Sequence, residues 1–215
     1  MNQYPTSSRN TLKRSSQRGH YDRETVYQIL DVGFLCHVGF TIGEQPYVLP
    51  NAYGREGDTL YLHGAIGNRM LNQLEKGVPV CITVTHTDGI VLARSVFHHS
   101  FNYRSVVVFG TARLVADENK EHALHMVTEQ ILKGRWDEAR TPTAQELKVT
   151  KVLAVEIEEA SAKVRTGPPK DDEEDYALPI WAGVLPLRTV AEEAVPDPVM
   201  KQKLSLPESV RQRMF

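Results

Sequence analysis

Cysteine is scarce in this chain, and this scarcity excludes several kinds of structure. Cys36 and Cys81 are the only cysteines, and both lie in apolar, strand-like segments, where a free thiol usually behaves as a small hydrophobic side chain. Without Cys-x-x-Cys spacing they form neither a disulfide framework nor, on their own, a thiolate zinc site or an iron–sulfur cluster. The possibilities that remain are an organic cofactor or no cofactor.

An excess of charge and a long apolar run are missing as well. The chain has 25 Lys and Arg against 27 Asp and Glu, a formal net charge of −2, so no broad basic field is available for nucleic acid. The longest apolar runs, such as residues 106–109, are far shorter than the roughly 20 residues that cross a bilayer. We therefore expect no nucleic-acid partner and no membrane partner.

The composition along the chain predicts one domain with looser ends. Residues 1–20 are polar and lack the apolar region of a secretory signal, so we expect a flexible leader in a cytoplasmic protein. The 41% of hydrophobic residues suffice for a core, which we place in a domain over 21–190, followed by a tail over 191–215. Near the end of this domain, the acidic run 171–175 reads as a solvated turn and the apolar segment 177–187 as buried.

Short β-rich segments dominate the chain after residue 33, and turn-forming residues at 43–44 and 55–58 separate the first of them. Six of them, at intervals of roughly ten residues, favour a closed or nearly closed antiparallel barrel. We expect a tight hairpin turn at Thr87-Asp88-Gly89. The expected strands are 34–40, 47–52, 59–63, 80–85, 90–95 and 104–115, with 152–157 closing the barrel.

Helical spacing of apolar residues interrupts this pattern at a few places. It predicts helices over 22–30, 66–74 and 117–134, and a capping box at Thr143 begins another short helix. The predicted fold class is therefore mainly β with flanking helices.

The segment 61–71 has the outline of a phosphate site. A strand ends at His63, two glycines allow a ligand close to the backbone, and Asn68 and Arg69 open a helix. Backbone amides, the helix dipole and a forked guanidinium all favour a phosphate monoester. A plain strand-turn-helix junction with a surface arginine would show the same pattern, so that alternative stays open.

A second candidate site opens the long β-rich segment 104–115. Arg94-Ser95 and the run 102–106 place hydroxyls and guanidinium groups where they could complete a phosphate site. The alternative is that Tyr103 and Arg104 merely end a hairpin.

The histidines do not form a recognisable metal site. His98 and His99 are adjacent, and His122 and His125 lack a Glu-x-x-His partner set, so we predict no metal. The chain also lacks Gly-x-Ser-x-Gly, P-loop and Gly-x-Gly-x-x-Gly motifs, so hydrolase, nucleoside triphosphatase and Rossmann dehydrogenase functions have no support.

Several longer motifs, in their order and spacing, resemble the pyridoxamine 5′-phosphate oxidase-like FMN-binding split barrels, in the branch of the nitroimidazole-resistance (Nim) flavoproteins. The similarity extends from about residue 22 to 187. The motifs are YVLPNAY at 47–53, LYLHGA at 60–65, YRSVVVFGTA at 103–112, KVRTGPP at 163–169 and WAGV at 181–184.

The resemblance implies a six-stranded antiparallel split β-barrel that forms a homodimer, with FMN between the two subunits. It implies that 63–69 and 104–105 hold the FMN phosphate, that 50–53 line the isoalloxazine ring, and that a C-terminal tryptophan approaches the flavin. The residues expected to bind the cofactor are Pro50, Asn51, Ala52, Tyr53, His63, Gly64, Ala65, Asn68, Arg69, Ser95, Tyr103, Arg104, Ser105 and Trp181.

The expected function is that of an FMN-dependent oxidoreductase that reduces a small aromatic or nitro-type acceptor, with His63 as a proton donor. True pyridoxamine phosphate oxidases carry a C-terminal Arg-x-His motif, which is missing from residues 209–215, so oxidation of vitamin B6 is doubtful. The alternatives are a flavin- or haem-binding protein without turnover, and a ligand-free interaction barrel.

Overall fold

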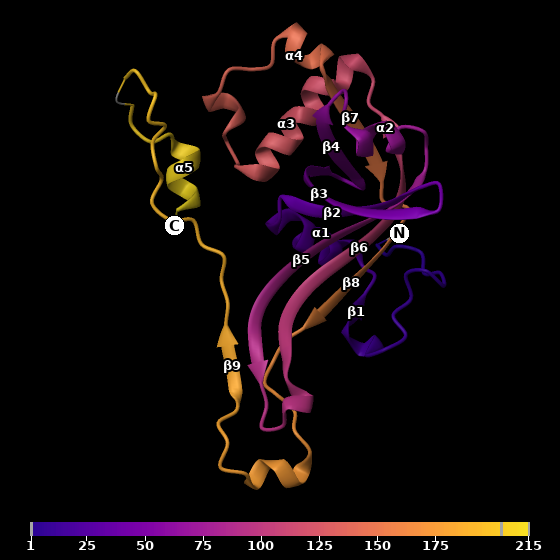
Figure 1. Ribbon diagram of the computed structural model, residues 1–215, viewed down its shortest axis with the longest axis vertical. Coiled ribbons are helices and arrows are strands. Elements are labelled where there is room, and N and C mark those ends of the chain that lie inside the picture. Colours follow the sequence, from indigo (N-terminus) through magenta and orange to yellow (C-terminus); the bar gives the residue numbers. More distant parts are fainter. Residues whose placement is uncertain (1, 203, 215) are drawn as a thin grey trace. The chain divides into compact units, whose positions relative to one another are not determined.

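The computed structural model describes residues 2–202 and 204–214, and its chain divides into two compact units (Figure 1). Unit 1 comprises Met1–Val32, Ile82–Phe109 and Glu158–Arg188, and unit 2 comprises Gly33–Cys81, Gly110–Ile157 and Thr189–Phe215. The chain crosses between the units five times, twice within long strands, β5 (Pro79–Leu92) and β6 (Ser100–Leu114). No helix in the described ranges is long and apolar enough to span a membrane.

Unit 1 is built on a sheet with the strand order β1-β8-β6-β5-β9. The strands are β1 (Gly19–His20), β8 (Glu159–Arg165), β6 (Ser100–Leu114), β5 (Pro79–Leu92) and β9 (Gly183–Pro186). Alternate residues of β6 are buried, Val106 and Val108 among them, and α1 (Arg23–Val32) adds three buried apolar side chains. The Asp22 carboxylate accepts the backbone N–H of Thr25 over 2.8 Å and so caps α1.

The N-terminal residues, expected to be a flexible leader, make specific contacts in unit 1. Tyr4 is 3% exposed, and the Ser7 hydroxyl donates to Glu159 over 2.6 Å. The buried Asn10 side chain donates to the Pro5 carbonyl over 2.8 Å. These contacts hold the segment against β8.

Unit 2 contains an antiparallel sheet in the order β2-β3-β4-β7, continued by the end of β6. Its strands are β2 (Leu35–Ile42), β3 (Gln45–Glu56), β4 (Thr59–Ala65) and β7 (Thr150–Glu156). Two tight connections join the first three strands, and Gly43 and Gly57 occupy them with φ of 59° and 55°. Glycine adopts this left-handed conformation at no steric cost, which confirms both predicted turns.

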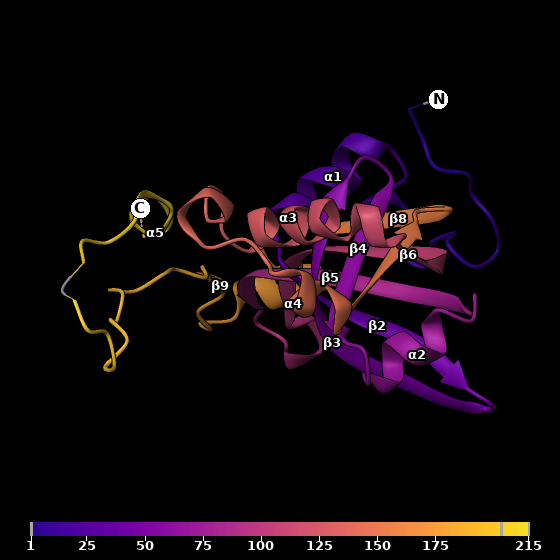
Figure 2. The same cartoon turned by 90° about the horizontal axis from the view of Figure 1, so that it is seen from above.

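The helices of unit 2 are α2 (Arg69–Leu74), α3 (Lys120–Ile131), α4 (Ala144–Lys148) and α5 (Glu208–Arg213). The predicted capping box at Thr143 is confirmed. Helix α3 covers β3 and β4 (Figure 2). Gly54 permits this close packing, because a Cβ at that position would lie 2.5 Å from the backbone of Met126.

Two predictions about turns and burial need correction, and one strand was missed. Residues 87–89 form no hairpin turn, because β5 continues through them and Gly89 pairs with Pro186 of β9. Strand β8 was not expected, since its small residues Ala160, Ser161 and Ala162 gave no strong β signal. The segment 177–187, expected to be buried, leaves Trp181 69% exposed.

Candidate functional site

In unit 2, two neighbouring strands bring the predicted ring-binding segment beside His63. Residues 50–53 lie in the middle of β3, and Tyr53 is paired with Leu62 of β4. The Asn51 side chain donates to the His63 carbonyl over 3.4 Å. Tyr53 is completely buried, so its side chain belongs to the core and only its backbone could line a ligand.

The His63 imidazole is half-buried, and its burial favours the neutral form of the ring. Its Nδ1 atom is buried and has no hydrogen-bond partner among the described residues. Burial lowers the pKa of His63 below its usual value of 6.5, because the charged form loses hydration. A neutral ring with an unsatisfied nitrogen can accept or donate one hydrogen bond or ligate a metal, but it is a poor source of a proton.

The turn after β4 is organised by Asn68. Its Oδ1 accepts the N–H of Leu71 over 3.1 Å, and its own N–H donates to the Ala65 carbonyl over 2.8 Å. A Cβ on Gly64 would lie 3.2 Å from the Asn68 amide, so the glycine lets this side chain fold back. Because these amides are occupied and α2 has only six residues, the helix dipole adds little to anion binding here.

Arg69, the first residue of α2, is held in place by an aromatic stack. Its guanidinium lies 4.9 Å from the centre of the Tyr47 ring, and Nη2 donates to the Tyr47 hydroxyl over 2.9 Å. Tyr47 stacks in turn on Phe40, with ring centres 5.5 Å apart. The stack orients the guanidinium and leaves most of its donors available to a ligand.

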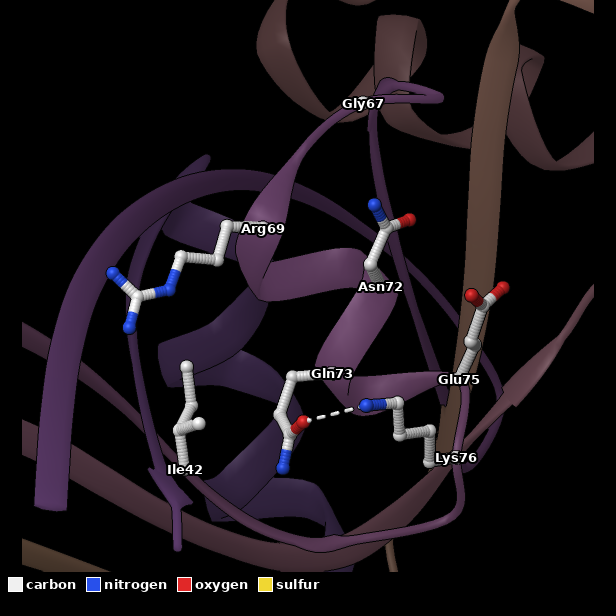
Figure 3. Close-up of a pocket in the computed structure, with 7 residues that line it drawn as sticks. All are labelled: Ile42, Gly67, Arg69, Asn72, Gln73, Glu75 and Lys76. Atoms are coloured by element: carbon white, nitrogen blue, oxygen red, sulfur yellow. Dashed lines mark hydrogen bonds between the residues drawn. The ribbon is translucent and has the colours of Figure 1, made fainter.

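A pocket of about 620 Å³ lies beside Arg69 on α2 (Figure 3). We call it the α2 pocket; it is lined by Ile42, Gly67, Arg69, Asn72, Gln73, Glu75 and Lys76. Sequence reasoning missed Asn72, Gln73 and Lys76. The signal that could have identified them is their spacing from Arg69, which places Asn72 and Gln73 on its face of α2, with Lys76 two residues after the end of the helix.

The α2 pocket has a positive lining. Lys151 of β7 places its Nζ 2.6 Å from Glu75 Oε2 and 2.5 Å from Asn72 Oδ1. Because this lysine compensates the charge of Glu75, Arg69 and Lys76 remain as two cations whose charge no neighbouring carboxylate offsets within the lining.

In unit 1, the predicted phosphate residue Arg104 is already paired with a carboxylate. Its Nε and Nη2 lie 2.9 and 2.8 Å from the two oxygens of Asp88. The hydrogen bond with Asp88 raises the pKa of Arg104, and the same contact lowers the pKa of Asp88. A phosphate at Arg104 would have to compete with this carboxylate.

The other predicted residues of unit 1 are also engaged locally. The Ser95 hydroxyl accepts the N–H of Phe97 and caps a short 3₁₀ helix (Val96–His98), and the Ser105 hydroxyl donates to the Lys163 carbonyl over 3.4 Å. Tyr103 packs on Phe101, with ring centres 4.9 Å apart. The structure thus brings the predicted residues together in two groups, one within each unit.

Asp171, from the acidic run, stabilises the loop that carries Arg94 and Ser95. Its side chain is completely buried and accepts the backbone N–H groups of Arg94 over 2.9 Å and of Ser95 over 3.2 Å. Burial opposes ionisation of Asp171, yet these hydrogen bonds outweigh it and hold the pKa of the carboxyl below its usual range. The prediction of a solvated turn is therefore wrong for this residue.

The chain matches the model of the pyridoxamine 5′-phosphate oxidase family over residues 22–164. The protein belongs to this flavin-binding family. The match confirms the predicted family and its fold class, an antiparallel split barrel of mainly β structure. A comparison with curated proteins gave no match.

Several solved structures are similar to this chain. A flavocytochrome from Azotobacter vinelandii is 40% identical with a TM-score of 0.90, over 96% of this chain and 97% of that one. A FAD- and haem-binding protein from Mycobacterium smegmatis is 37% identical with a TM-score of 0.88, over 92% and 97%. A protein assigned to 5-nitroimidazole antibiotic resistance, from Bacteroides thetaiotaomicron, is 26% identical with a TM-score of 0.56, over 68% and 86%.

Proposed function

We propose that this protein is a flavin-dependent oxidoreductase that passes electrons to a small acceptor, and that it carries haem as a second cofactor. The observation that carries the proposal is the 40% identity, over 96% of the chain, with a flavocytochrome. The 37% identical protein, named for FAD and haem, supports the same pair of cofactors.

The residues of unit 2 fit a flavin. Arg69, oriented by Tyr47, would bind the phosphate next to the flavin, because a guanidinium makes paired hydrogen bonds to phosphate oxygens. Residues 50–53 would line the ring, with His63 beside them on β4. The flavin supplies the electron chemistry, and these residues bind and orient it.

His63 is proposed to act as a neutral hydrogen-bonding group rather than as the proton donor that we expected. Its low pKa and unsatisfied Nδ1 suit a contact to a flavin ring atom or to a bound acceptor. Such a contact would hold the acceptor against the flavin, and the small aromatic or nitro-type acceptor remains our proposal for the substrate.

Two histidines fit the requirements of a haem ligand. The Nδ1 atom of His63 is buried and is proposed above for the flavin or the acceptor, so His63 would bind haem only through its Nε2 atom. His99 is exposed, and its Nδ1 lies 3.1 Å from the Ser95 carbonyl; donation from Nδ1 to this carbonyl would leave Nε2 with the lone pair that a haem iron requires. Replacing each by alanine and recording the Soret band would identify the ligand.

We further propose a cytoplasmic homodimer with the flavin between its subunits. Trp181 and Ile180 are 69% and 48% exposed, and Phe97 of the same unit is 85% exposed. Several large apolar side chains exposed in one unit are typical of a surface that another chain covers.

The deciding experiment is an absorbance spectrum of the purified protein, with Arg69→Ala alongside. We expect flavin bands together with a Soret band, and weaker flavin bands in the variant. Bleaching of the bound flavin by a reductant, followed by reoxidation on adding a nitroaromatic acceptor, would establish turnover. A bound flavin that never reoxidises with any acceptor would leave a cofactor carrier, and a colourless protein would leave an interaction barrel.

A further inference from the structure

Arg165, the last residue of β8 in unit 1, is a buried cation that no carboxylate among the described residues neutralises. It is 7% exposed, and its Nη1 donates to Oδ1 of Asn102. Asn102 is itself 8% exposed and donates from Nδ2 to the Gly167 carbonyl over 3.1 Å. A buried amide therefore orients the guanidinium, while the charge stays uncompensated, which is costly for a buried group.

One edge of the Arg165 guanidinium is available to a ligand. The Nε and Nη2 atoms of an arginine lie side by side and match the two oxygens of a carboxylate, and Arg104 binds Asp88 through these same two atoms. Within the described part of the chain, the fully buried nitrogens that lack a partner belong to His63 and Arg94. The Nε and Nη2 atoms of Arg165, which have no partner there either, therefore remain in contact with solvent.

The surroundings of Arg165 favour an anion. Burial lowers the pKa of Arg165, and the nearby positive charge of Arg18 lowers it further, whereas the contact with Asp88 raises the pKa of Arg104. Lys163, two residues earlier in β8, adds a cation on the same face of the strand. Residues 1–21, which include Arg18, contain no Asp or Glu. A bound anion would relieve the repulsion between these cations.

An aromatic surface adjoins the guanidinium. Tyr103 of β6 is the cross-strand partner of Arg165, so the two side chains start from the same face of the sheet (Figure 1). Phe101 packs on Tyr103 with ring centres 4.9 Å apart, and it is 49% exposed. An exposed ring beside a guanidinium can stack on the aromatic ring of a ligand whose acidic group reaches the cation.

We propose that unit 1 binds a small aromatic carboxylate, with the carboxylate on Nε and Nη2 of Arg165 and the ring on Phe101 and Tyr103. The inference goes beyond the proposed function, because none of its contacts requires a bound flavin. The propionate groups of haem have the same chemistry, an acid on an aromatic framework, and the experiment separates the two sources.

The test titrates the protein as purified, with its cofactors bound, with benzoate and with benzamide in calorimetry. The two probes share a ring and a similar shape, and only benzoate is charged. We expect about one benzoate per chain, and binding of benzamide that is weaker by about tenfold or more, because a contact to a charged group is lost.

Three variants locate the site. Arg165→Gln should weaken benzoate binding about tenfold or more and leave benzamide binding unchanged. Phe101→Ala should weaken the binding of both probes. Because Phe101 is half-exposed, this variant tests the same site even if Arg165→Gln does not fold. Arg113, an exposed arginine of β6 in unit 2, gives the control Arg113→Gln, which should change neither.

The inference is overturned if benzoate and benzamide bind equally well, if neither binds, or if benzoate binding survives Arg165→Gln. Benzoate that binds only after haem has been removed, and that added haemin displaces, would assign the guanidinium to a haem propionate and would also overturn a site for a free acid. A protein that binds benzoate but no flavin would refute only the proposed function, so the two failures are distinguishable.

Discussion

Arg104 and Asp88 form a paired contact between β6 and β5, with nitrogen–oxygen distances of 2.9 and 2.8 Å. The contact explains why Thr87-Asp88-Gly89 stays extended. In a hairpin turn an aspartate side chain usually bonds its own backbone, whereas here the carboxylate is bound by the neighbouring strand. The same contact also occupies the guanidinium that we had expected to hold phosphate.

We expect Arg104→Ala to change flavin affinity less than Arg69→Ala does. Because Arg104 and Asp88 are 35% and 33% exposed, the pair should stabilise the fold by at most about 1 kcal/mol. Urea denaturation and flavin titration of both variants measure the two effects. A loss of flavin affinity in Arg104→Ala as large as that in Arg69→Ala would restore Arg104 to the phosphate site.

Local sequence signals identified the elements that depend on neighbours in the chain. The turns at Gly43 and Gly57 and the capping box at Thr143 depend on backbone conformation or on contacts within a few residues, and all were predicted. The strand β8 was missed because its burial depends on β1 and β6, which are distant in sequence.

The same reasoning explains what was missed at the candidate site. Asp171 reaches Arg94 across 77 residues, and Lys151 reaches Glu75 across 76, so no local pattern reports either contact. The Gly64 to Arg69 segment was identifiable because glycines, a capping residue and an arginine follow one another directly. Its continuation to Lys76 required the fold of α2 against β2.

Asp171 should make unfolding stability depend on pH at the acid end. Its pKa is lowered in the folded state, so its carboxylate stabilises the fold above the unfolded value of roughly 4, and this contribution disappears as the pH falls through the folded pKa. Asp171→Asn should therefore be less stable than wild type at pH 7, with the difference shrinking below about pH 4.

Thermal unfolding from pH 3 to pH 7 measures the effect of Asp171, and the exposed neighbour Glu174 supplies the control Glu174→Gln. A wild-type protein and an Asp171→Asn variant of equal stability at every pH would contradict the buried hydrogen bonds.

Gly54→Ala should destabilise the fold strongly. The added methyl would lie 2.5 Å from the carbonyl carbon of Met126 and 2.5 Å from the N of Val127, so α3 must move away from β3. Overpacking of this kind costs about 1–3 kcal/mol. Gly67→Ala is the matched control, since a Cβ there meets nothing within 4 Å. Urea midpoints that are equal in the two variants would show that α3 does not pack as described.

His63 should titrate below its usual value in the folded protein. Burial disfavours the imidazolium, so the unfolded chain takes up a proton near pH 6.5 before the folded protein does. Stability therefore falls as the pH drops from about 6.5 through the folded pKa, and His63→Gln should remove this part of the pH dependence. The Hε1 proton of His63, assigned in NMR spectra with the same variant, should give a midpoint below 6.5. A midpoint above that value would mean that an anionic partner stabilises the charged ring, and His63 would then regain the role of proton donor.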